Sequence, residues 1–175
     1  MSVATLRTRT LAALALLASI ALTSAESRAQ GAPGSPAVSA ADRAAVMGVV
    51  RALFDAMRAG DSAAVRAQFH PRAQLATAAM NQQGTPVVRM DSLASFVRAV
   101  GTPHADVWDE KFRNEVVHVD GPLASVWVDY AFFAGTKFSH CGVDAFQLAR
   151  SAEGWRIIAL ADTRKREGCD EASWR

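Results

Sequence analysis

Residues 137–169 read KFSHCGVDAFQLARSAEGWRIIALADTRKREGC, and this stretch decides the fold. Segments 137–150 and 155–163 are rich in apolar, aromatic and β-branched residues that alternate with polar ones, which favours β-strands. Residues 151–154 between them are turn residues, so the two segments form the last hairpin of a predicted antiparallel sheet. The stretch also holds one His, two Asp and both cysteines of the protein.

The strand pattern begins earlier in the chain. Segments 112–119 and 123–133 alternate in the same way, and Asp120-Gly121-Pro122 between them is a tight-turn signal. Together with the last hairpin they predict a four-strand meander. Residues 75–80 and 86–90 flank a polar turn and predict a further small hairpin.

Three helices are predicted before the meander. The first covers residues 42–60, because its apolar residues recur at helical spacing and a glycine ends it. Asp61 caps a short second helix that Pro71 ends, and Asp91 caps a third that ends at residue 101. This element order predicts an α+β fold, with helices packed on one face of a curved antiparallel sheet.

The first 29 residues have the pattern of a secretory signal peptide. Arg7 and Arg9 precede the apolar run 11–22, and small residues make Ala25 and Ala29 alternative cleavage sites. The run is shorter than the roughly 20 residues of a membrane-spanning helix, although a retained anchor is the alternative interpretation. We therefore expect an exported, periplasmic or secreted protein with no membrane span after signal removal. The expected organisation is a signal peptide (1–29), a flexible linker (30–41), one domain (42–169) and a tail (170–175).

Cleavage would remove the excess of positive charge. Three of the 19 basic residues and one of the 17 acidic residues lie in residues 1–29, so the remaining chain carries 16 of each. A formal charge of zero gives no electrostatic case for nucleic acid as a partner. The basic run 164–166 is interpreted as a solvated strand end.

The two cysteines suit one disulfide. An even count in an exported chain favours a bond between Cys141 and Cys169. A reactive thiol is the alternative, but neither cysteine lies at a predicted helix N-terminus that would activate it.

Short motifs then occur in a familiar order along residues 42–169. Ala59-Gly60-Asp61, Phe69-His70-Pro71 and Gly154-Trp155-Arg156-Ile157 resemble the nuclear transport factor 2-like (SnoaL-like) superfamily. Residues 139–146 with 162–164 are most similar to its exported branch labelled putative lumazine-binding. The resemblance implies a cone-like α+β domain, with helices on the concave face of the sheet around a pocket, and frequent homodimers through the outer face. It implies no single activity, because the superfamily includes isomerases, dehydratases, cyclases and binding modules.

The candidate catalytic residues are His140, Asp144 and Asp129. A turn at residues 134–135 would place His140 opposite Asp129, and a turn at 134–136 would place it opposite Tyr130. Either neighbour would hydrogen-bond to His140, and a carboxylate would suit it to general-base catalysis. Asp144 shares its face because residues four apart in a strand point the same way. The structural alternative is a satisfied polar pair in a partly buried sheet.

The candidate ligand-binding residues are Tyr130, Trp127, Trp108 and Asp162. Buried Tyr and Trp side chains need a partner for their polar groups, which suits them to a pocket. Asp162 either joins His140 and Asp144 at the mouth or pairs with Arg164. Five phenylalanines are interpreted as core: Phe54, Phe96, Phe112, Phe132 and Phe146.

The motifs for other chemistries are absent from the sequence. His140 and Cys141 are adjacent in a strand and face opposite sides, so we expect no metal site there, and no cofactor is implied. The chain contains no G-x-S-x-G elbow and no glycine-rich phosphate loop. We therefore expect an exported domain that binds a small apolar or aromatic molecule. The alternatives are an isomerase, dehydratase or cyclase with His140 as base, and a structural dimerisation module.

Overall fold

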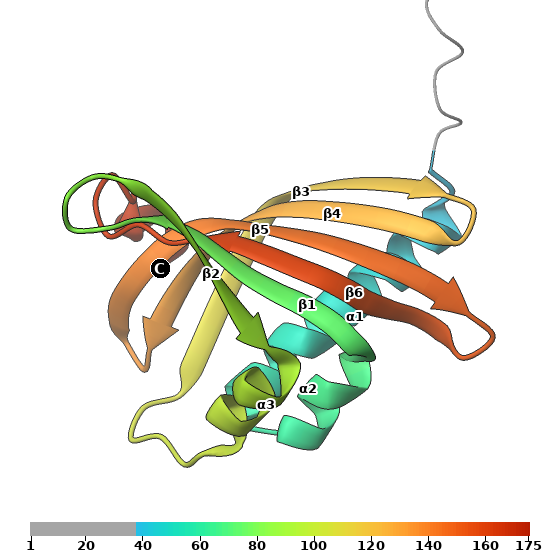
Figure 1. Cartoon of the computed structure of the whole chain (residues 1–175), viewed down its shortest axis with the longest axis horizontal. Helices are drawn as coiled ribbons and strands as arrows, with labels where there is room; N and C mark the ends of the chain where they lie inside the picture. Colours follow the sequence, from blue (N-terminus) through green and yellow to red (C-terminus); the bar gives the residue numbers. More distant parts are fainter. Residues whose placement is uncertain (1–37) are drawn as a thin grey trace, which may run out of the picture. The chain divides into compact units, whose positions relative to one another are not determined.

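The computed structural model describes residues 38–175, and Figure 1 shows the arrangement of their elements. The predicted signal peptide and residues 30–37 of the predicted linker lie outside this range. In chain order the elements are α1 (Ala40–Ala59), α2 (Ser62–Gln68), β1 (Phe69–Met80), β2 (Pro86–Ser92), α3 (Leu93–Gly101), β3 (Trp108–Asp120), β4 (Leu123–Ala134), β5 (Lys137–Ser151), β6 (Gly154–Thr163) and the 3-10 helix η1 (Glu171–Trp174).

The strands form one curved, unclosed six-stranded sheet in the order β2-β1-β6-β5-β4-β3. The predicted α+β fold and the four-strand meander are confirmed, since β3, β4, β5 and β6 pair antiparallel in sequence order. One pair differs from the predicted antiparallel sheet, because β1 lies parallel to β6. Strand β1 follows α2 directly at Phe69. Its partner β6 is the last strand of the chain, so this pair is not part of a hairpin.

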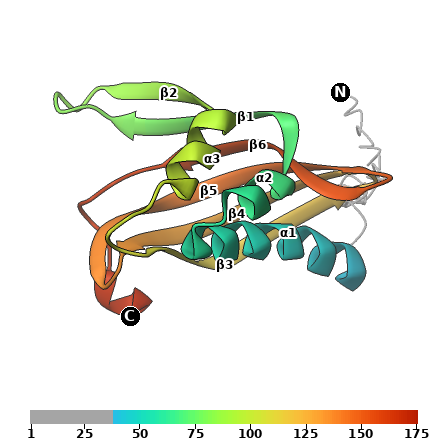
Figure 2. The same ribbon diagram turned by 90° about the horizontal axis from the view of Figure 1, so that it is seen from below.

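The three helices cover the concave face of the sheet (Figure 2). Helix α1 is amphipathic and buries one stripe of apolar side chains, among them Val46, Val50, Leu53 and Phe54, against the sheet. On the sheet side the core is formed by the inward-facing residues Val126, Val128, Phe146, Leu148, Trp155 and Ile157. Burial of these alternate strand positions holds the helical and sheet layers together.

Local signals set the helix ends. Gly60 takes the left-handed conformation after α1 (φ 66°), and Asp61 accepts hydrogen bonds from the backbone N–H groups of Ala63 and Ala64 at the start of α2. The predicted cap of the third helix is wrong by one residue. Ser92, not Asp91, caps α3 by accepting from the Ser95 N–H, which leaves Asp91 at the end of β2.

The register of the β4–β5 hairpin differs from both predicted registers. Gly135 (φ 59°) and Thr136 form a two-residue turn, and Ser139 is an extra residue that bulges out of β5. His140 therefore lies opposite Phe132, so the predicted pairing with Asp129 or Tyr130 is wrong. The bulge brings His140 onto the concave face, where its side chain joins those of Tyr130 and Phe132.

The predicted disulfide between Cys141 and Cys169 is confirmed. It joins β5 to the segment that follows β6, with the two Cα atoms 6.0 Å apart. The predicted tail is structured, because Trp174 of η1 stacks on the Arg113 guanidinium at 3.9 Å and accepts from Lys111 through its carbonyl. Within residues 38–175, no helix is both long and apolar enough to cross a membrane.

Candidate functional site

A pocket of about 320 Å³ lies between the concave face of the sheet and helices α1 and α3. Its size is at the lower end of the range for small-molecule sites. The helices contribute apolar groups, namely Leu53, Phe54, Met57, Phe96 and Ala99. The strands contribute the polar groups Thr77, Asp91, Glu110, Tyr130, His140, Asp144 and Asp162, and Arg164 follows the end of β6. The pocket thus has an apolar helical wall facing a polar patch on the sheet.

The deepest polar feature is a pair of carboxyl groups, Glu110 from β3 and Asp144 from β5. Asp144 is 3% exposed, and its carboxyl group lies next to that of Glu110. Burial raises the pKa of Glu110 to about 7. Burial, and then the adjacent Glu110, raise the pKa of Asp144 well above its usual range. Both shifts favour the protonated, uncharged forms of these carboxyl groups.

A second polar group is centred on Asp162 of β6. Its carboxylate accepts hydrogen bonds from Arg164 Nε and from Thr77 Oγ1, each at 2.5 Å. Asp162 lines the pocket and also pairs with Arg164. The ion pair neutralises this carboxylate at the pocket surface.

Tyr130 of β4 lies between the two carboxyl groups and the end of β6. Its hydroxyl donates to the Thr163 carbonyl at 2.9 Å. Burial and the surrounding carboxylates raise its pKa, so the phenol remains protonated. Gly142 makes this contact possible, because a Cβ atom at that position would lie 1.8 Å from the Thr163 oxygen and 2.9 Å from Tyr130 Cε1.

His140 lies in an aromatic setting. Its ring stacks on Phe132 with 5.1 Å between centroids and meets Tyr130 edge-on at 5.7 Å. Nδ1 is 3.0 Å from Ser139 Oγ. Burial and the positive charge of Arg164 lower its pKa to about 4, so the imidazole is neutral and a weak base at neutral pH.

Two of the predicted site residues lie outside this pocket. Asp129 is on the outer face of β4 and accepts a hydrogen bond from Asn114 Nδ2 at 2.8 Å. Trp127 is on the same outer face and is 53% exposed. The pocket brings together the other predicted residues: His140, Asp144, Tyr130, Trp108 and Asp162.

Sequence reasoning missed Glu110, whereas its assignment of five phenylalanines to the core is confirmed, because all five are in the core cluster or packed against it. Glu110 lies between Trp108 and Phe112 on the concave side of β3, two residues before the strand was predicted to begin. The alternation Trp-x-Glu-x-Phe is the signal that could have identified it. Three phenylalanines predicted to be core also line the pocket: Phe54, Phe96 and Phe132.

The sequence also matches a known protein family. Residues 41–161 match the profile of the family described as putative lumazine-binding. The chain belongs to this family. The predicted resemblance to the nuclear transport factor 2-like superfamily is thereby confirmed.

Solved structures share the fold of this lumazine-binding-family domain. A nuclear transport factor 2-like protein of unknown function from Shewanella baltica is 13% identical, with a TM-score of 0.58 over 74% of this chain and 98% of that chain. A cystatin-like protein of unknown function from Nostoc punctiforme is 10% identical (TM-score 0.59; 74% and 96% covered). A nuclear transport factor 2-like protein from Novosphingobium aromaticivorans is 15% identical (TM-score 0.59; 76% and 87%). These identities support the fold alone, and a comparison with curated proteins found no match.

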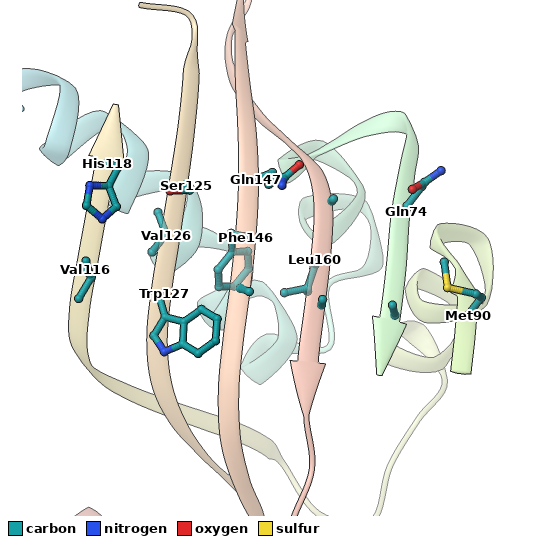
Figure 3. A pocket seen from close by; sticks show the side chains of 14 residues that line it. Gln74, Met90, Val116, His118, Ser125, Val126, Trp127, Phe146, Gln147 and Leu160 are labelled. Atoms are coloured by element: carbon teal, nitrogen blue, oxygen red, sulfur yellow. The ribbon is translucent and has the colours of Figure 1, made fainter. Parts of the chain in front are cut away.

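The domain has a second hollow, on the outer face of the sheet (Figure 3). Trp127 of β4 lies at its centre beside Val116 and His118 of β3, on the side away from the helices. Val116 and Met90 in this hollow are 49% and 65% exposed. The outer face therefore presents an apolar surface around one tryptophan.

Proposed function

We propose that this domain is an exported binding protein for a small, largely apolar or aromatic molecule, which it holds in the concave pocket. The observation that carries the proposal is the combination of an apolar helical wall with a few convergent polar side chains in one cavity of about 320 Å³. The disulfide and the N-terminal signal pattern support export, since disulfides persist in oxidising compartments.

The residues have separate roles in this proposal. Phe96, Phe132 and Trp108 supply apolar contact area, while Tyr130, Glu110 and the Asp162–Arg164 pair orient the polar end of the ligand. The neutral His140 imidazole supplies one further hydrogen-bonding nitrogen.

The test compares two tryptophans. A panel of aromatic and heterocyclic compounds is screened for a ligand that raises the melting temperature of the wild type. Trp108→Ala, in the pocket, should abolish the ligand-induced shift, whereas Trp127→Ala, on the outer face, should keep it. Failure of the whole panel, or equal loss in both variants, would refute ligand binding at the concave pocket.

Acid–base catalysis is the second candidate function, and the observation that favours it is the carboxyl pair. A carboxyl group with a pKa of about 7 next to the protonated Tyr130 can exchange a proton with a bound substrate at neutral pH. His140 as general base has less support, because its lowered pKa makes it a weak base and Asp129 is not beside it. Turnover of a pocket ligand that disappears in Glu110→Gln, with ligand binding retained, would support an enzyme; an unchanged ligand after prolonged incubation would count against one.

The outer face supports a homodimer as the assembly state. Its exposed apolar residues, centred on Trp127, suit a self-complementary contact between two copies. Light scattering on purified protein tests this: Trp127→Glu should convert a dimer into a monomer, whereas Val107→Glu, equally exposed but in the loop before β3, should not. A monomeric wild type would contradict the proposal.

A further inference from the structure

The pocket is lined by more acidic than basic side chains. Among residues 38–175, four acidic side chains and one basic side chain line it: Asp91, Glu110, Asp144, Asp162 and Arg164. Arg164 is bonded to Asp162 at 2.5 Å and neutralises it, while Asp91 is exposed at the end of β2. The Glu110–Asp144 pair is left without a basic partner inside the cavity.

One oxygen of this pair is unsatisfied. Asp144 is 97% buried, and its Oδ2 receives no hydrogen bond from any group that the structure describes. A buried carboxyl oxygen without a donor is costly, and protonation of the carboxyl group limits only the part of that cost that comes from charge. A bound molecule that brings its own N–H donors would satisfy both carboxyl groups.

The walls around the pair are aromatic. Phe54 of α1, Trp108 of β3 and Phe132 of β4 line the same cavity, and the Trp108 and Phe132 rings meet edge-on at 5.8 Å. Aromatic faces attract cations, most strongly where water is excluded. Carboxyl groups at the base of an aromatic pocket favour a positively charged ligand over a neutral or negative one of the same shape.

We propose that the pocket selects a small organic cation, a protonated amine on an apolar or aromatic body, whose ammonium group lies between the carboxyl groups of Glu110 and Asp144. The inference rests on the small-molecule-binding function proposed above and names the class of its ligand. The ammonium donates to the two carboxyl groups, the body of the ligand lies against Phe54, Phe96 and Phe132, and any proton that Glu110 holds passes to solvent on binding.

Amine binding is consequently linked to pH. Glu110 loses its proton as the pH rises through about 7, which gives the pair a negative charge, so amine affinity increases over this interval. The other groups facing the pair do not reverse this trend, since His140 is already neutral, Tyr130 stays protonated, and Arg164 remains charged on Asp162. Asp91 faces the cavity from the end of β2.

Isothermal titration calorimetry tests the inference on the full chain after removal of the signal peptide. The three probes share a naphthalene body and differ in the charge of their polar group. Naphthylmethylamine should bind about tenfold more tightly than naphthylmethanol, the effect of a desolvated cation on carboxylates and aromatic faces, and naphthoate should bind most weakly. The amine affinity should rise between about pH 6 and about pH 8, while the alcohol affinity stays constant.

A double variant with a charge-matched control locates the effect. Glu110→Gln/Asp144→Asn should remove the preference for the amine over the alcohol, and with it the pH dependence of amine binding. Asp120→Asn/Glu153→Gln removes the same two charges from exposed positions away from the pocket and should behave like the wild type. If the double variant does not fold, the three wild-type affinities decide alone.

Three outcomes overturn the inference. Equal or tighter binding of the alcohol refutes the cationic ligand class but leaves small-molecule binding standing. An amine preference that survives in the folded Glu110→Gln/Asp144→Asn variant refutes the assignment to this pair. Absence of binding by all three probes refutes both the cationic class and the proposed binding of aromatic molecules.

Discussion

Gly142 is the position where one added methyl group should have the largest effect on the pocket. An alanine Cβ there would lie 1.8 Å from the Thr163 carbonyl oxygen, 2.8 Å from the Thr163 carbonyl carbon and 2.9 Å from Tyr130 Cε1. The obstructing atoms at Thr163 are backbone atoms, so β5 and the end of β6 must separate to accept the methyl group. This separation breaks the hydrogen bond from the Tyr130 hydroxyl to Thr163.

The magnitude follows from two contributions. Overpacking of a tight contact costs about 1–3 kcal/mol, and leaving the buried Tyr130 hydroxyl without its partner costs about another 1–3 kcal/mol. We therefore expect Gly142→Ala to lose roughly 2–6 kcal/mol of the free energy of unfolding, a large share of the about 5–15 kcal/mol typical of a domain.

Urea unfolding followed by circular dichroism measures this loss, and Gly48→Ala is the matched control. Gly48 is exposed in the middle of α1, and a Cβ there meets no atom within 4 Å, so alanine should stabilise that helix by about 1 kcal/mol. The same substitution should thus have opposite signs at two glycines. A Gly142→Ala loss below about 0.5 kcal/mol, the range of surface substitutions, would refute the close contact at Thr163.

Three further predictions concern stability. Replacing Cys141 and Cys169 by serine should cost about 2–5 kcal/mol in urea unfolding, and a reducing agent should have the same effect on the wild type and none on the variant. The folded-state pKa of Glu110 is raised from 4.5 to about 7, so its contribution to stability is present below pH 4.5 and is lost as the pH rises towards 7. Glu110→Gln should therefore gain stability relative to the wild type over that interval, and parallel stability–pH curves would contradict the raised pKa. Asp61→Ala should cost about 1 kcal/mol because Asp61 caps α2 through two backbone N–H groups, whereas Asp61→Asn should be nearly neutral in the same assay.

The fold could be predicted from the sequence because its signals are local. The spacing of Val46, Val50 and Leu53, the Gly60-Asp61 boundary and the alternation of residues 123–133 each indicate one element, and the structure forms those elements. Their order then leaves few ways to pack three helices on one sheet. The parallel contact of β1 with β6 is long-range and has no such local signal.

The site could be predicted only in part, because a single bulge changes which residues share a face. A β-strand has period two, so the extra residue Ser139 shifts every partner across the β4–β5 pair by one position. His140 and Asp144 keep their common face because both follow the bulge. The turn lies at residues 135–136, one residue later than the predicted two-residue turn, and together with the bulge this moves the partner of His140 from Asp129 to Phe132. Trp127 was predicted to line the pocket but lies on the exposed outer face. The alternation of a strand separates its two faces, but it does not say which face the helices cover.

The central claim, that the concave pocket binds a small aromatic ligand, is tested most directly by indole N–H resonances in a titration with naphthylmethylamine. The described chain has a tryptophan in the pocket, Trp108, and another on the outer face, Trp127. Saturable movement of the Trp108 resonance, with the Trp127 resonance unchanged, is the predicted result. Movement of Trp127 in place of Trp108, or of neither resonance, would contradict the claim.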